Sequence, residues 1–168
     1  MDAYETGVPR RWRASATPKR ASEMMIIRGI TKQDFDYIVA VFDQWWGGPS
    51  SERASPFFFH ELGQYALIAE EDGAVIGFLL GLVPAGGSTG YVHLVGIDPN
   101  HRRHGVGKRL YQHFCDSCSQ QGLKSLKAIG MVGHEASMRF HSALGFDVKE
   151  VADYAGPGRA RVVFMKKL

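Results

Sequence analysis

Apolar residues recur along the chain with two periods, and their succession predicts the order of the elements. Short apolar runs bounded by turn residues predict strands at residues 25–28, 65–69, 74–83, 92–97, 123–131, 146–151 and 161–168. Helical spacing predicts helices at residues 31–46, 51–62, 105–121 and 135–144. The resulting order, βααβββαβαββ, predicts an α/β (α+β) domain with a mixed sheet and helices on both of its faces.

Residues at the predicted helix ends support these assignments. Thr31 with Asp34 three positions later has the pattern of a helix N-cap with a weak capping-box partner. Gly122 and Gly145 stand where two of the other helices should end, because glycine readily adopts the left-handed conformation that closes a helix.

Residues 1–23 differ in composition from the rest of the chain. They hold Arg10, Arg11, Arg13, Lys19 and Arg20 and show little apolar periodicity. We interpret this stretch as a basic, disordered N-terminal extension that precedes a single domain at residues 24–168. A natural start at Met24 or Met25 and a basic arm that touches nucleic acid or the ribosome remain alternatives.

Composition excludes several classes of protein. A chain of 168 residues with 45% hydrophobic and 22% charged residues is expected to fold rather than to stay disordered. The net charge of +3 is too small to indicate nucleic-acid binding by itself, so we regard that partner as unfavoured. No apolar run approaches a membrane span, and two cysteines do not make a disulfide scaffold, so a reduced cytoplasmic compartment is the default expectation.

A strand, a turn and a helix start meet within residues 92–110. Asp98-Pro99 ends the apolar run, and Gly105-Val106-Gly107-Lys108 opens the next helix. Such a junction presents free backbone N–H groups and the positive end of a helix dipole, which together bind anions. The stretch lacks the residues of a Walker loop and the third glycine of a dinucleotide fingerprint. It does match the pattern [QR]-x-x-G-x-[GA] at residues 102–107.

This pattern resembles the coenzyme A pyrophosphate loop of the GNAT acyltransferases. Residues 134–146 resemble the second motif of that family, in the variant that has histidine at the Tyr/His position and is typical of the phosphinothricin acetyltransferase-type branch. The resemblance covers residues 25–168. It implies a mostly antiparallel sheet of about 6–7 strands with about four helices, an acetyl-CoA donor and transfer of the acetyl group to a primary amine, catalysed by an acyltransferase without a metal.

The resemblance also implies which residues bind the cofactor. The pyrophosphate would contact the loop and helix start, and the pantetheine arm would pair with the preceding strand as an added strand. The residues assigned to coenzyme A are Leu94, Val95, Ile97, Arg102, Arg103, His104, Gly105, Val106, Gly107, Lys108, His134, Ser137 and His141. His134 departs from the family, which has asparagine there. Gly96 is expected to mark either a β-bulge or a site of close packing.

Two histidines are candidates for proton transfer. Strand alternation places His93 on one face with Tyr91, Val95 and Ile97, where its imidazole would accept the proton of the amine. The resemblance places His141 near the coenzyme sulfur, where it would protonate or hydrogen-bond the leaving thiolate. The alternatives are a histidine bonded to a carbonyl for His93 and helix packing for His141. Cys115 and Cys118 lack a partner pair, so no metal site is expected.

The acceptor site is the part that the sequence defines least. Trp45, Trp46, Tyr91, Asp153 and Tyr154 are the candidate substrate residues, on account of their aromatic faces and the one carboxylate. A coenzyme A-binding module without turnover and a ribosome- or nucleic-acid-associated protein are the alternative functions. A homodimer is a further expectation.

Overall fold

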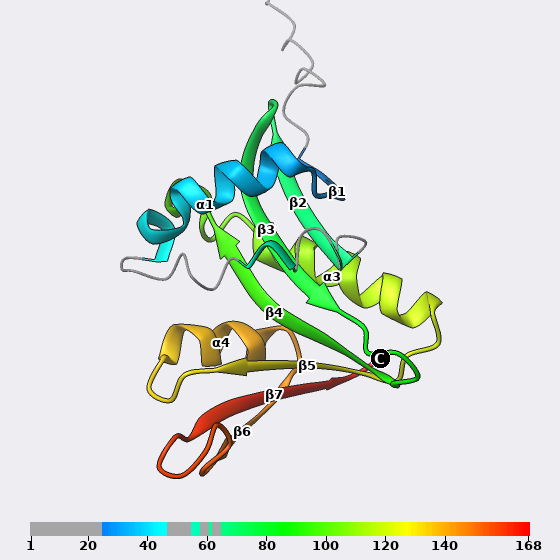
Figure 1. The fold of residues 1–168 in the computed structure, drawn as a ribbon, viewed down its shortest axis with the longest axis vertical. Helices are drawn as coiled ribbons and strands as arrows, with labels where there is room; N and C mark the ends of the chain where they lie inside the picture. The colour runs from blue at the N-terminus through cyan, green and yellow to red at the C-terminus, as the bar shows by residue number, and fades with distance from the viewer. Residues whose placement is uncertain (1–24, 47–54, 58–60, 62–64) are drawn as a thin grey trace, which may run out of the picture.

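A seven-stranded sheet lies at the centre of the protein, in a computed structural model that describes residues 25–46, 55–57, 61 and 65–168 (Figure 1). The strands are β1 (Ile26–Gly29), β2 (Ala66–Glu71), β3 (Ala74–Leu82), β4 (Thr89–Ile97), β5 (Ser125–Gly130), β6 (Asp147–Val151) and β7 (Arg161–Lys167). Their order in the sheet is β1-β2-β3-β4-β5-β7-β6. Only β4 and β5 run parallel. The mixed, mostly antiparallel sheet is therefore as predicted.

Three α-helices accompany the sheet in the described part of the chain: α1 (Lys32–Trp46), α3 (Val106–Gln120) and α4 (Glu135–Ala143). A short 3-10 helix, η4 (Pro99–His101), follows β4. The helix count is thus slightly below the predicted four, and most of the helix predicted at residues 51–62 lies outside the described residues.

Each face of the sheet has its own apolar cluster, although on one face the cluster covers only β2, β3 and part of β4. On one face α3 and α4 pack against a cluster that includes Leu79, Phe114 and Phe164. On the other face α1 packs through Ile38 and Phe42. Strands β2 and β3 contribute to both clusters, which explains why their sequences are continuous apolar runs rather than alternating ones.

The start of α1 confirms the predicted capping box. The backbone N–H of Asp34 donates to Thr31 Oγ1 at 3.3 Å, and the N–H of Thr31 donates to Asp34 Oδ2 at 2.7 Å. Arg28 on β1 donates to both oxygens of the same carboxylate, at 2.6 and 2.9 Å. These bonds fix the direction in which α1 leaves β1 and crosses the sheet toward β4.

Candidate active site

Strands β4 and β5 are paired over only part of their length. The pairs run from Thr89–Ser125 to Val92–Ala128, after which neither strand continues the ladder with the other. Figure 1 shows the two strands diverging beyond this point. The second half of β4, residues 93–97, therefore borders an opening, in which backbone groups on the β5 side of β4 have no ladder partner among the described strands. The opening closes at the Val92–Ala128 pair.

A β-bulge in β4 lies at His93. Leu80 of β3 pairs with Leu94, but the next residue of β3, Gly81, pairs with Val92, so His93 is the additional residue. The bulge reverses the alternation, and Val95 and Ile97 pack into the cluster under α3 while Leu94 packs on the α1 side. The His93 ring lies 6.3 Å from that of Tyr91, and Tyr91 pairs with Lys127, whose neighbours Leu126 and Ala128 lie in the cluster under α3. His93 therefore lies with Tyr91 on the opposite face, and the prediction that it shares a face with Val95 and Ile97 is wrong.

Gly96 is a site of close packing and not the position of the bulge. A Cβ atom at this residue would stand 2.6 Å from Phe78 Cε1 and 2.9 Å from Trp46 Cη2. Glycine thus allows the two aromatic rings to lie directly on β4. Of the two alternatives that the sequence left open for Gly96, the structure selects this one.

The loop after β4 leads into an uncapped helix start. Arg103 and Gly105 both have a left-handed backbone, with φ of 66° and 81°, and Gly105 is the N-cap of α3 without any side-chain cap. The first intrahelical bond found there runs from the N–H of Arg109 to the carbonyl of Gly105. The preceding N–H groups at the helix start consequently lack an intrahelical acceptor and are available to an anion. Gly107 permits close packing against Phe140 of α4, because a Cβ there would lie 3.0 Å from the ring.

The arginine that opens the predicted loop pattern turns away from this helix start. Arg102 donates from Nη2 to the carbonyl of Trp45 at the end of α1, and from Nε to the carbonyl of Ile97 at 3.3 Å. A guanidinium at the C-terminal end of a helix is favourable for the helix dipole. Arg102 thereby ties the end of α1 to the end of β4. Arg103 and His104 of the loop and Lys108 in the first turn of α3 are further exposed basic residues.

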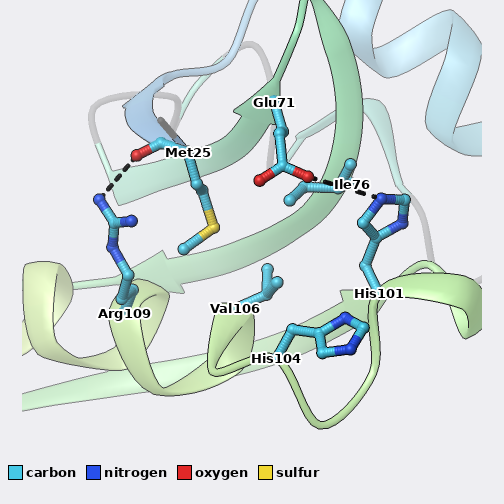
Figure 2. A pocket seen from close by; sticks show the side chains of 7 residues that line it. All are labelled: Met25, Glu71, Ile76, His101, His104, Val106 and Arg109. Atoms are coloured by element: carbon cyan, nitrogen blue, oxygen red, sulfur yellow. Dashed lines mark hydrogen bonds and ion pairs between the residues drawn. The ribbon is translucent and has the colours of Figure 1, made fainter. Parts of the chain in front are cut away.

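A pocket of about 310 Å³ flanks the loop on the side of β1, β2 and β3. Figure 2 shows His101 and His104 at its edge, with Glu71 and Met25 opposite. His101 Nδ1 lies 2.9 Å from Asp98, and its Nε2 lies 3.8 Å from Glu71. Asp98 also accepts the N–H of Asn100 at 3.0 Å. These contacts stabilise the turn between β4 and α3 and connect it to the end of β2.

Helix α4 faces the opening from the other side, and His134 is its N-cap. His134 Nδ1 accepts the N–H of Ser137 at 3.3 Å, so it performs the capping that asparagine commonly performs. Because Nδ1 is the acceptor, the proton of a neutral imidazole is on Nε2, which the exposed side chain presents to solvent.

His141 lies inside the protein, between α4, α3 and β7. Its Nδ1 is 2.8 Å from the carbonyl of Ser137, its Nε2 is 2.8 Å from the Tyr111 hydroxyl, and its ring stacks on Phe164 at 3.9 Å. Only 5% of the residue is exposed, and burial lowers its pKa although the Ser137 hydrogen bond acts in the opposite direction. Both ring nitrogens therefore have partners, and the ring is not presented to the opening.

Tyr111 is a residue that the sequence interpretation missed. It is 2% exposed, and burial raises the pKa of its hydroxyl, which favours the protonated, hydrogen-bond-donating form. Its signal in the sequence was weak, because Tyr111 falls beside the apolar stripe of α3 and looks like one more core residue.

The predicted acceptor residues lie on three elements: α1, strand β4 and the loop between β6 and β7. Trp45 is buried in the α1 cluster, and Trp46 is 37% exposed and stacks on Phe42 at 4.2 Å. Tyr154 lies in the β6–β7 loop, and burial, followed by the proximity of Tyr154, raises the pKa of Tyr91. Asp153 Oδ1 accepts the N–H of Gly158 at 2.6 Å, so this carboxylate shapes the loop.

The described residues contain neither a candidate metal site nor a candidate membrane-spanning helix. They contain no group of three or more His, Cys, Asp or Glu residues that would hold a metal ion. Nor does any described helix have the length and hydrophobicity needed to cross a membrane.

Comparison with known proteins decides the family. The family model described as acetyltransferase (GNAT) family matches residues 32–146, more than half of the chain. The chain belongs to this family. A phosphinothricin N-acetyltransferase of Streptomyces viridochromogenes is 35% identical over 60 residues, which are 36% of this chain and 33% of that protein. The alignment thus spans about a third of the curated relative, and the resemblance to the phosphinothricin-type branch agrees with it.

Solved structures share the fold of this family member. Ard1 of Thermoplasma volcanium superposes with a TM-score of 0.72 at 18% identity, over 86% of this chain and 97% of that one. A phosphinothricin acetyltransferase of Sinorhizobium meliloti, solved in complex with AcCoA, gives 0.67 at 20% identity, over 86% and 88%. These likenesses support the fold, and the opening between β4 and β5 lies within it.

Proposed function

We propose that this member of the GNAT family transfers an acetyl group from acetyl-CoA directly to a primary amine. The observation that carries the proposal is the meeting of two features at one end of β4. The strand separates from β5 after Val92, and the chain then leads into the uncapped start of α3. A linear amide with a pyrophosphate at one end is complementary to both features at once.

The pyrophosphate would bind the N–H groups of residues 105–108, with Arg103, His104 and Lys108 adding charge. The pantetheine arm would lie along Leu94, Val95 and Ile97 of β4, and His134 Nε2 and Ser137 of α4 would approach it from the other side. Arg102 would contribute by holding the loop, because its guanidinium is engaged by the carbonyls of Trp45 and Ile97. In this arrangement the thioester points to the closed end of the opening, next to His93.

In the reaction the amine nitrogen attacks the thioester carbonyl carbon and forms the C–N bond. The C–S bond then breaks, and the sulfur leaves as the coenzyme A thiolate. His93 would accept the proton that the amine loses, directly or through water. Departure of the thiolate needs little assistance, since the ordinary pKa of a thiol is only about 8.5. No covalent acyl-enzyme is needed.

For His141 we propose a positioning role in place of proton donation. Both of its ring nitrogens are bonded, Nδ1 to the Ser137 carbonyl within α4 and Nε2 to Tyr111 of α3, so the histidine holds together the two helices that would flank the cofactor. A second candidate function is a coenzyme A-binding module without turnover. The burial of His141 favours it, because a buried His141 would leave the coenzyme sulfur without a proton donor from α4.

A thiol-release assay with acetyl-CoA tests the proposal. The acceptors would be a panel of small amines, amino acids, amino-terminal peptides and aminoglycosides, with calorimetric measurement of coenzyme A binding in parallel. Amine-dependent release together with the acetylated amine by mass spectrometry is the expected result. Tight coenzyme A binding without release for any acceptor would instead establish the non-catalytic module. Absence of coenzyme A binding would overturn both.

A further inference from the structure

A lysine lies on the acceptor side of the sheet, at the closed end of the opening. Lys127 belongs to β5, and its neighbours Leu126 and Ala128 are buried in the cluster under α3. Since side chains alternate along a strand, Lys127 points to the opposite face. Its Nζ lies 5.1 Å from the centre of the Tyr154 ring, a cation–π contact.

The register places Lys127 close to the reacting groups. Lys127 pairs with Tyr91 of β4, and this pair is one step before the last pair of the β4–β5 ladder. His93, the proposed base, is two residues from Tyr91, which corresponds to roughly 7 Å along an extended strand. A molecule whose nitrogen lies beside His93 would therefore extend to the ammonium of Lys127.

The positive charge of Lys127 is not neutralised by its described neighbours. Within the described residues Lys127 forms no ion pair, and its ammonium lies over the uncharged ring of Tyr154. Asp147 lies in the same row of the sheet but two strands away, beyond Met165, at roughly 10 Å. Asp153, beside Tyr154, accepts the N–H of Gly158 and forms no ion pair with Lys127 among the described residues. The only other charge on this face of β6 near that row is Lys149, which adds to the positive potential.

We propose that Lys127, held over the ring of Tyr154 and beside Tyr91, binds a carboxylate of the acceptor, so that the substrates are small amines that carry a carboxylate. The inference rests on the proposed acetyl transfer and specifies its acceptor. An acceptor without a carboxylate would gain no electrostatic interaction with the Lys127 ammonium. An acceptor with a carboxylate would accept a charge-assisted hydrogen bond from Nζ. The aromatic ring on the other side restricts the lysine to a few conformations, which lowers the entropic cost of binding.

The test compares matched acceptors that differ only in the carboxylate. Leucine is paired with isopentylamine, and γ-aminobutyrate with propylamine, so that the second pair places the carboxylate further from the nitrogen. The value of kcat/KM is measured for wild type, Lys127→Met, Lys127→Arg and Lys149→Met. Lys149→Met is the matched control, because it removes the same charge from the same face of the sheet at an exposed position.

We expect Lys127→Met to lower kcat/KM for the carboxylate acceptor by about 10- to 100-fold, the usual effect of losing a hydrogen bond to a charged group. The kcat/KM of Lys127→Met for the amine without a carboxylate should change little. Lys127→Arg should retain part of the preference for the carboxylate acceptor over this amine, and Lys149→Met should retain nearly all of it. The acceptor pair that shows the larger loss reports the distance between amine and carboxylate.

Three results would overturn the inference while leaving acetyl transfer intact. The first is a wild-type enzyme that acetylates the amines as well as their carboxylate counterparts. The second is an equal loss for both members of a pair in Lys127→Met, accompanied by a shifted pH profile, which would mean that the lysine only lowers the pKa of the bound amine. The third is an equal loss in Lys149→Met, which would indicate a long-range field. Failure of the proposed function is different, because no amine would then release coenzyme A.

Discussion

The hydrogen bond between Tyr111 and His141 predicts a pair of substitutions that compensate one another. The carbonyl of Ser137 can only accept a hydrogen bond, so His141 Nδ1 carries the proton and Nε2 accepts from the Tyr111 hydroxyl at 2.8 Å. Tyr111→Phe leaves Nε2 without a donor, and His141→Phe leaves the hydroxyl without an acceptor. Each single substitution should lower the free energy of unfolding by about 1–3 kcal/mol, the cost of an unsatisfied buried polar group.

The double variant Tyr111→Phe/His141→Phe removes both polar atoms of this bond. Its loss of stability should therefore be smaller than the sum of the single losses, with a coupling of about 1–2 kcal/mol. Urea unfolding of the four proteins, followed by circular dichroism at one pH, gives the cycle directly. If the losses in the free energy of unfolding were strictly additive, the hydrogen bond between Tyr111 and His141 would be refuted, and the positioning role of His141 with it.

The lowered pKa of His141 adds a dependence on pH to the same cycle. Burial depresses the pKa in the folded state below the ordinary value of 6.5, so below that value the unfolded chain binds a proton that the folded protein does not. The contribution of His141 to stability is full above pH 6.5 and is lost as pH falls toward the folded pKa. The slope is at most about 1.4 kcal/mol per pH unit, and His141→Phe should remove it. An identical acid slope in wild type and variant would contradict this assignment.

Substitutions elsewhere test the packing and the loop. Gly96→Ala should lower the free energy of unfolding by about 1–3 kcal/mol, because its Cβ would overlap two aromatic rings, while Gly29→Ala, with nothing within 4 Å, should be nearly neutral; equal thermal shifts would disprove the packing role. Arg102→Gln should destabilise the protein with little change in coenzyme A affinity, whereas Arg103→Gln should weaken coenzyme A binding with little change in stability. Calorimetry measures the affinities and thermal unfolding the stabilities. A loss of affinity in Arg102→Gln with a loss of stability in Arg103→Gln would contradict both assignments. Burial raises the pKa of Cys118 to about 11, so its thiol should react with Ellman's reagent at pH 8 only after unfolding, and rapid labelling of the native protein would speak against the burial.

The sequence predicted the sheet, the turn after β4 and the start of α3 correctly because each has a local signal. Apolar runs, turn residues and capping residues reflect backbone preferences that act over a few positions, as at Thr31 and Asp34. Strand β4 begins three residues earlier than predicted, at Thr89, because its first residue is held by a hydroxyl contact of 2.8 Å with Ser125, a residue far away in the sequence.

The structure of the site differed from the prediction at two points, one set by an additional residue in a strand and the other by the direction of a side chain. The bulge at His93 does not interrupt the apolar run of β4, so strict alternation put Val95 and Ile97 on the wrong face. The direction of Arg102 depends on a carbonyl at the end of α1, which no local pattern reveals. Lys127, in contrast, was detectable, since a lysine between two apolar residues of a strand predicts a charge on the less buried face.

The proposed pyrophosphate site at the start of α3 can be tested at Gly105. A side chain at this position would extend into open space in front of the free N–H groups, because no atom lies within 4 Å of its Cβ. Asparagine and aspartate have nearly the same shape, both tolerate the left-handed backbone better than other residues, and both are good N-caps. Gly105→Asn and Gly105→Asp therefore differ mainly in one negative charge, and both should fold.

Isothermal titration of coenzyme A into wild type, Gly105→Asn and Gly105→Asp is the most direct measurement of the central claim. One carboxylate about 5 Å from one phosphate charge, at an effective dielectric constant of about 20, costs about 3 kcal/mol. The Kd of Gly105→Asp should accordingly exceed that of Gly105→Asn by about 100-fold or more. Equal affinity of the two variants for coenzyme A would place the pyrophosphate elsewhere and contradict the account.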